Sequence, residues 1–339
     1  MDCYRLSFQG PFHVDGRGVG FYEASEPFIR SDTLSAALLS AWALLDPTGA
    51  GQRAAEPPFK VSSCFPYWRD RFFLPRPVAS VALCLPEERL DEYKTLKKIQ
   101  WLTPELWKQA AVAAEQWQPP VTIEPAKKMA IWQGVLALPT AQAYDLPKRL
   151  WAEEERPRLS VERTSNSPVE SALFHFGRVY FQNEGGLYFL THFDDSARRT
   201  EFEAALSLLG DQGLGADRTS GGGFFTWEQG KVPELPGLSD GPAIADGPAI
   251  ALSLVNPAPE DCQGDWLRDA KYNLVNRGGW IAYSGLRRKR VRMFTEGSEF
   301  ARPLQGRVVD VTPNACDNLL SHRVYRDGRG FFVRLGKRP

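Results

Sequence analysis

The chain contains few of the side chains that usually perform acid–base or metal chemistry. Its 339 residues include only four histidines, and none lies in an HExxH motif or at another paired-histidine spacing. A GxSxG nucleophile motif is also missing. The five cysteines are scattered and form no CxxC pair, which argues against a disulfide framework and a structural zinc site. The sequence therefore predicts no catalytic residue, no metal and no cofactor.

A glycine-rich segment at residues 213–223, GLGADRTSGGG, is the most informative stretch. Consecutive glycines permit positive φ angles and close approach of a ligand, and successive N–H groups can form a nest for an anion. Neither GxxxxGK[ST] nor GxGxxG is matched, which excludes a Walker loop and a dinucleotide fingerprint. The segment predicts contact with phosphate or nucleic acid, with a flexible surface loop as the alternative. The candidate residues are Gly213, Leu214, Gly215, Arg218, Thr219, Ser220, Gly221, Gly222 and Gly223.

A second candidate is the basic run at residues 287–292, where five of six residues are basic. If this run is a strand, Arg288, Arg290 and Arg292 project from one face and match phosphates along a single-stranded nucleic acid. A charged sheet edge that discourages aggregation is the alternative. The candidate RNA-binding residues are Arg287, Arg288, Lys289 and Arg290.

Charge is distributed unevenly along the chain, although the formal net charge is zero. Residues 271–339 carry 15 Lys/Arg and 5 Asp/Glu, whereas residues 161–270 carry 7 Lys/Arg and 17 Asp/Glu. The basic block can form a positive surface that attracts phosphates. The alternative is that the acidic segment folds beside it and neutralises it.

The elements that must position these residues begin with a strand at residues 4–8 and a glycine-containing loop. A helix is predicted after the loop, with Ser31 or Asp32 as its N-cap. Its first residues offer N–H donors and hydroxyls to a phosphate or sugar, so Ser31, Asp32 and Thr33 are candidate RNA contacts.

The middle of the chain is rich in aromatic residues and prolines. Residues 61–78 predict an irregular hairpin or projecting segment, in which Phe65 or Tyr67 stacks on bases or packs against a neighbouring subunit. A helix begins at Thr103, and Trp107 on its apolar stripe is predicted to lie in the core.

The second half predicts a linker at residues 153–158 and a hairpin of strands 174–181 and 187–193. A helix at 196–209, capped by Gly210, follows. The fold class is α+β, with two ferredoxin-like (RRM-like) domains in tandem, at residues 1–158 and 159–339. No apolar run long enough for a membrane span and no signal peptide is seen, so we expect a cytoplasmic protein.

Several motifs in this order resemble the RAMP superfamily of CRISPR proteins. The similarity is specific to the subunit that caps the 5′ end of the guide RNA in type III-A (Csm-type) complexes. It spans nearly the whole chain except residues 87–128, which match no family feature. The motifs are YRLSFQGPFHVDG, the helix start at Ser31–Leu34, SSCFPYWRDRFFLPRP, FGRVYFQNEGGLYFL, the glycine loop and RVRMFTEGSEF.

The resemblance implies a non-catalytic ribonucleoprotein subunit for antiviral defence. Its expected partners are the crRNA 5′ tag, the large polymerase-like CRISPR subunit and the backbone RAMP subunit. The alternative is a RAMP-type endoribonuclease that processes the crRNA precursor, with His13 as the candidate catalytic residue. A general base would also need a partner acid and a positioned 2′-hydroxyl, which the sequence does not reveal.

Overall fold

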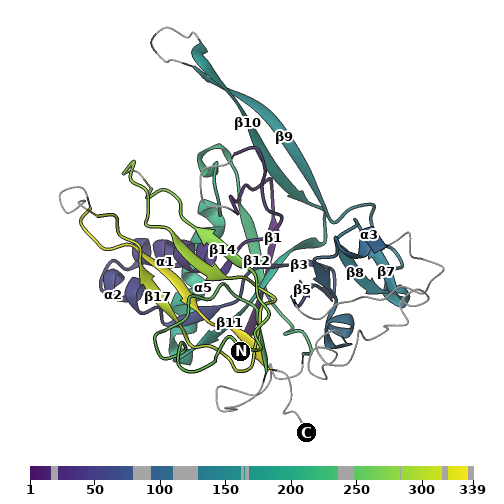
Figure 1. Cartoon of the computed structure of the whole chain (residues 1–339). Helices are drawn as coiled ribbons and strands as arrows, with labels where there is room; N and C mark the ends of the chain where they lie inside the picture. The colour runs from purple at the N-terminus through teal and green to yellow at the C-terminus, as the bar shows by residue number, and fades with distance from the viewer. Residues whose placement is uncertain are drawn as a thin grey trace.

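The chain folds into several small sheets and few helices, in agreement with the predicted α+β class (Figure 1). A computed structural model describes residues 1–16, 22–78, 93–109, 129–161, 164, 168–235, 248–282, 284–314 and 320–334. In this part of the chain, no helix is both long and apolar enough to cross a membrane. Nor do the described His, Cys, Asp and Glu side chains form a group of three that could hold a metal ion.

The central sheet contains six antiparallel strands that come from both halves of the chain. Its order is β12-β1-β11-β3-β4, and β2 also pairs with β11. The strands are β1 (Asp2–Phe8), β2 (Phe59–Val61), β3 (Phe65–Trp68), β4 (Arg71–Phe72), β11 (Gly185–Phe193) and β12 (Phe225–Gly230).

Four of these strands and two helices, α1 (Ser31–Leu45) and α5 (Arg199–Gln212), occur along the chain in the order β1, α1, β3, β11, α5 and β12, with other elements between them. This is the ferredoxin-like order βαββαβ. The boundary predicted at residue 158 falls inside this unit, because β1 pairs with both β11 and β12. The linker predicted at residues 153–158 is also wrong, since those residues belong to the strand β9 (Trp151–Val161).

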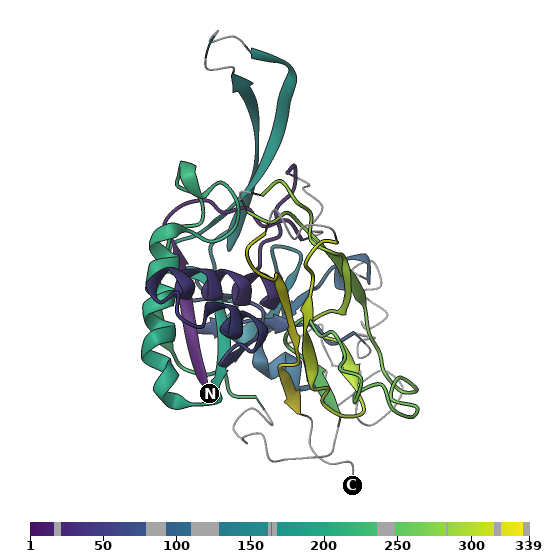
Figure 2. The ribbon, with the colours of Figure 1, turned by 90° about the vertical axis from the view of Figure 1, so that its left-hand side faces the viewer.

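Two helices cover one face of the central sheet. α1 (Ser31–Leu45) lies between α5 (Arg199–Gln212) and the C-terminal strand β18 (Tyr325–Arg329) (Figure 2). Leu34, Leu38 and Trp42 of α1 are buried at helical spacing, as are Phe202 and Leu206 of α5, whereas Leu45 at the end of α1 is exposed.

Both predicted caps are wrong. α1 begins at Ser31 itself with Arg30 as its N-cap, and α5 continues to Gln212 with Gly213 as its C-cap.

The aromatic segment at residues 61–78 contains the hairpin of β3 and β4, as the first of the two predicted alternatives has it, and it packs into the central sheet instead of projecting. Phe65 and Tyr67 are buried in β3, which lies between β11 and β4, so they are not available to stack on bases. The predicted core position of Trp107 is confirmed. Both outcomes follow from the apolar area of these rings, which is most stable away from water.

The element that projects is the hairpin of β9 and β10 (Pro168–Phe181) (Figure 1). The predicted pairing of 174–181 with 187–193 is therefore wrong, since β10 pairs with β9 and β11 enters the central sheet.

The other described elements are two short helices and four small sheets. The helices are α2 (Ala50–Ala55) and α3 (Tyr93–Leu96). One sheet has the strand order β5 (Leu74–Pro75), β6 (Trp101–Leu102), β8 (Leu136–Pro139) and β7 (Met129–Trp132), and a second has the order β16 (Glu299–Phe300), β13 (Ala249–Ala251) and β19 (Phe332–Arg334). The two remaining sheets are the pairs of β14 (Leu274–Arg277) with β15 (Val291–Phe294) and of β17 (Gly306–Asp310) with β18.

Candidate nucleic-acid interface

The glycine loop is a tightly hydrogen-bonded turn after α5. The Leu214 N–H donates to the Gly223 carbonyl at 2.9 Å, and the Ala216 N–H donates to the His13 carbonyl at 2.9 Å. The Gly223 N–H donates to the Pro11 carbonyl at 2.8 Å. These amides are occupied inside the protein and are not available to a phosphate, so they do not form the predicted nest.

The glycines of this loop serve close backbone packing. Gly215 and Gly223 have φ angles of 96° and 78°, and a Cβ at either position would overlap a carbonyl oxygen, of His13 or Leu214 respectively. Gly221, by contrast, has φ 83° with open space beside it. The part of the loop that faces solvent is the 3₁₀ turn Arg218–Ser220, whose three side chains are exposed.

Asp217 connects the glycine loop to the projecting hairpin. This contact was not predicted from the sequence. Its carboxylate accepts hydrogen bonds from Arg158 Nη1 at 2.8 Å, Arg158 Nη2 at 2.5 Å and Arg178 Nη2 at 2.8 Å. Burial alone would raise the pKa of Asp217, but Arg158 and Arg178 hold it below its usual value. The loop and the base of the hairpin are therefore held together by a charged contact.

The hairpin itself exposes large apolar side chains. Leu159 and Leu173 face each other across β9 and β10 and are 48% and 63% exposed. Val161 and Phe174 are exposed on the same arm. Such apolar surface on a projecting element is typical of a site that a partner covers.

The start of α1 is turned into the protein. Leu254 N–H donates to Ser31 Oγ at 2.9 Å, and Arg277 Nη2 donates to Thr33 Oγ1 at 2.9 Å. The side chain of Asp32 is 0% exposed and pairs with Arg277 and Arg326. Burial would raise the pKa of Asp32, but the two guanidiniums hold it well below its usual value. The side chains of Ser31, Asp32 and Thr33 thus join α1 to the C-terminal part of the chain.

The basic run reaches the surface, but not as one strand. β15 begins only at Val291, so the predicted row of Arg288, Arg290 and Arg292 along a strand is wrong. Lys289 and Arg290 are exposed, and so is Arg287, whose guanidinium carbon lies 4.4 Å from the ring centroid of Trp280. Arg288 is partly buried behind them.

The segment at residues 9–16 contacts both the glycine loop and Arg277 of β14. Its His13 carbonyl accepts from the glycine loop, while its Gly16 carbonyl accepts from Arg277 Nη1 at 2.7 Å. This short segment therefore links the glycine loop to Arg277 of β14.

His13 is poorly placed for cleavage of RNA. Its side chain is 2% exposed, and Nδ1 lies 2.8 Å from the Gly177 carbonyl oxygen. The ring packs 4.5 Å from Phe176, and burial lowers the pKa of His13. The described residues around His13 therefore bury its imidazole.

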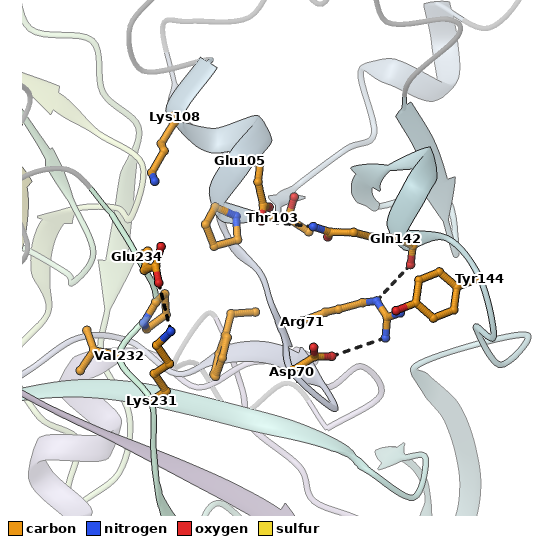
Figure 3. A pocket seen from close by; sticks show the side chains of 13 residues that line it. Asp70, Arg71, Thr103, Glu105, Lys108, Gln142, Tyr144, Lys231, Val232 and Glu234 are labelled. Carbon is orange, nitrogen blue, oxygen red and sulfur yellow. Dashed lines mark hydrogen bonds and ion pairs between the residues drawn. The ribbon is translucent and has the colours of Figure 1, made fainter.

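A polar pocket of about 520 Å³ lies away from both regions (Figure 3). Its charged side chains are largely paired with one another, as in the Lys231–Glu234 ion pair at 3.0 Å. Gln142 Nε2 likewise donates to Glu105 Oε1 at 3.1 Å. The residues that line the pocket come from four separate segments, so no sequence motif indicates it. Their positive and negative charges balance, so the pocket has no excess positive charge that would attract a nucleic acid.

Comparisons with known proteins agree on one family. A family model described as the CRISPR Csm4 C-terminal domain matches residues 246–335. A curated relative, "CRISPR system Cms protein Csm4" of Thermococcus onnurineus, is 25% identical over 287 residues, 80% of this chain and 78% of the relative. The protein of the same name from Mycobacterium tuberculosis is 29% identical over 180 residues, 50% of this chain and 54% of the relative.

Solved structures show the same fold. A Csm3-Csm4 subcomplex of a type III-A CRISPR-Cas interference complex matches with TM-score 0.67 and 16% identity, over 99% of this chain and 100% of that chain. A Csm1-Csm4 cassette in complex with pppApA matches with TM-score 0.55 and 18% identity, over 99% and 98% of the two chains. By sequence and by fold the chain is therefore similar to Csm4 proteins, and its residues 246–335 match the Csm4 C-terminal domain.

Proposed function

We propose that this chain is a non-catalytic RNA-binding subunit of a type III-A CRISPR interference complex. It holds the repeat-derived 5′ tag of the crRNA. The observation that carries the proposal is the exposed basic run of Arg287, Lys289 and Arg290, which lies within the range matched by the Csm4 C-terminal model. Arginine and lysine side chains attract RNA by neutralising backbone phosphates. Arg218, exposed on the glycine loop, adds a further cation.

The same proposal assigns two protein partners. Structural relatives with this fold are described as a Csm3-Csm4 subcomplex and a Csm1-Csm4 cassette. We infer that this chain likewise links the large polymerase-like subunit to the first backbone subunit. The exposed apolar arm of the β9–β10 hairpin supports such an assembly, because a partner that covers it removes apolar surface from water.

The proposal also includes the predicted second ferredoxin-like domain. The described strands after residue 248 form three small sheets within the range matched by the C-terminal family model. We place the second domain there, after the ferredoxin-like unit that ends with β12.

A salt series tests the RNA-binding role. The purified chain, alone and with its large-subunit partner, is titrated with tag-bearing and tag-scrambled single-stranded RNA. The variant Arg287→Gln/Lys289→Gln/Arg290→Gln should weaken binding and lower the slope of log K against log salt by about 2. The matched control Lys94→Gln/Lys148→Gln/Arg149→Gln removes three exposed charges elsewhere and should leave the slope unchanged.

Electrophoresis of the same samples separates binding from cleavage. Intact, tag-preferring RNA complexes support the proposed function. Tag-specific products that disappear in His13→Ala would instead establish the endoribonuclease alternative. If the slope of log K against log salt is the same in the wild type and the basic-run variant, the exposed basic run does not bind RNA and the proposal loses its support.

A further inference from the structure

Trp280 is exposed, unlike every other tryptophan in the part of the chain that the structure describes. It is 46% exposed, whereas Trp42, Trp68 and Trp107 are buried and Trp227 is half-buried. An indole ring carries a large apolar surface that is more stable away from water. Single exposed rings do occur on protein surfaces, so the surroundings of Trp280 decide whether its position indicates a ligand.

A short antiparallel hairpin holds Trp280 directly opposite Arg287. The Ile281 N–H donates to the Leu286 carbonyl at 2.8 Å, and the Leu286 N–H donates to Ser284 Oγ at 3.1 Å. Residues opposite one another on antiparallel strands have their side chains on the same face. The guanidinium carbon of Arg287 accordingly lies 4.4 Å from the ring centroid of Trp280. The backbone therefore holds an exposed ring and an exposed cation side by side, which limits the conformational entropy that a ligand must remove.

The cations next to this ring have no carboxylate partner. Arg329, in the same basic C-terminal block, pairs with Asp327 at 2.8 Å. The exposed Arg287, Lys289 and Arg290 form no ion pair with a carboxylate in the described ranges of the chain. Three residues of backbone span at most about 11 Å, so these three cations begin close together. An exposed ring beside unpaired cations matches a ligand that is both aromatic and anionic, and a nucleotide is both.

We propose that Trp280 stacks on one nucleobase of the bound RNA, while Arg287 at its side donates to a neighbouring phosphate. This inference rests on the proposed RNA binding and assigns one base-binding position to it. The ring is accessible for stacking, because its 46% exposure is that with Arg287 already in contact. A guanidinium that stacks through its face keeps its N–H groups at the edge, where phosphate oxygens can accept from them.

An abasic scan tests the assignment. The full chain is titrated with a set of tag RNAs in which each nucleotide in turn lacks its base. One position should weaken wild-type binding by about tenfold, as expected for the loss of one stacked base. Trp280→Ala should weaken binding of the intact RNA by about the same factor and abolish the sensitivity to that position. Trp280→Phe keeps an aromatic face and should retain most of both.

The salt dependence of binding separates stacking from charge. Trp280→Ala removes no charge, so the slope of log K against log salt should not change, whereas Arg287→Gln should lower the slope by about 1. Tyr144→Ala is the matched control, since it removes an aromatic ring that is 66% exposed beside the polar pocket. This control should leave both the affinity and the abasic profile unchanged.

Four outcomes would contradict the assignment, and each has its own signature. An abasic profile that is the same in Trp280→Ala and wild type overturns base stacking while RNA binding itself stands. Failure of the wild type to bind any tag RNA defeats the proposed function and this inference with it. Weaker capture of the large subunit by Trp280→Ala, with unaltered RNA binding, would assign the ring to a protein interface. A lower Tm of Trp280→Ala, with binding weakened equally for every abasic RNA, would show that Trp280 is a structural residue.

Discussion

Asp217 and Asp32 are both held by two arginines, and both lie in segments that the sequence marked for RNA binding. The side chain of Asp217 is 10% exposed and stands beside the solvent-facing turn Arg218–Ser220. The side chain of Asp32 is 0% exposed, and its neighbours Ser31 and Thr33 accept hydrogen bonds from Leu254 and Arg277. The glycine loop thus combines a buried charged contact with an exposed surface, whereas the helix start provides a buried charged contact alone.

This difference teaches that small polar residues and glycines do not by themselves mark a binding surface. In the glycine loop, the amides of Leu214, Ala216 and Gly223 are used internally, and the exposed side chains of Arg218–Ser220 remain for a ligand. At the helix start, the Asp32 carboxylate and the Thr33 hydroxyl hold Arg277 and Arg326 inside the protein. Burial decides which of the two roles a segment has.

The largest effect is expected from Asp32→Asn. The substitution leaves Arg277 and Arg326 buried without their counterion, which costs about 3–5 kcal/mol of folding free energy. Urea denaturation measures the change in the free energy of unfolding. Asp211 is exposed, so the control variant Asp211→Asn should change that free energy by about zero. If the free energy of unfolding falls by less than about 1 kcal/mol, the ion pairs of Asp32 do not hold α1 to the C-terminal part of the chain.

A smaller effect is expected from Asp217→Asn. The variant loses charged hydrogen bonds from Arg158 and Arg178 at a partly exposed site, so the expected cost is about 1.5–3 kcal/mol. Hydrogen exchange should quicken at the base of the β9–β10 hairpin and in the glycine loop together. Faster exchange in only one of these segments would show that Asp217 does not couple them.

The smallest effect is a difference in pH dependence. Because the folded pKa of Asp32 is depressed below its ordinary value of 3.8, its contribution to stability is present above that pH and is lost as the pH falls toward the folded pKa. The free energy of unfolding of the wild type relative to Asp32→Asn should fall by about 1.4 kcal/mol per pH unit below about pH 4.

Asp217→Asn provides the comparison for this measurement, because the pKa of Asp217 is also depressed. Its pH-dependent difference from the wild type should have the same sign. A relative stability of the wild type that rises as the pH falls would contradict both assignments.

Much of the local structure was predictable from the sequence. The apolar stripe of α1 and that of α5 repeat at helical spacing, and Leu38 and Phe202 are buried as that spacing requires. The alternation of β1 and the core position of Trp107 were likewise predictable. At the candidate nucleic-acid interface, the exposed side chains of Lys289 and Arg290 agree with the positive surface that the basic C-terminal block predicts.

The sequence could not reveal how distant segments pair. Residues 69–184 lie between β3 and β11, so the ferredoxin-like hairpin is interrupted where sequence reasoning placed a domain boundary. The same distance hid the burial of Phe65, whose strand β3 pairs with β11. Periodicity reports which face of an element is apolar, but it does not report which element covers that face.

The sequence by itself determined the class of elements, the apolar faces of the helices and the presence of a basic C-terminal run. Only the tertiary structure decided that Asp32 meets Arg277 and Arg326, which lie 245 and 294 residues away along the chain. The physical reason is that a buried ion pair depends on which charges are enclosed together, and spacing along the chain carries no record of that enclosure.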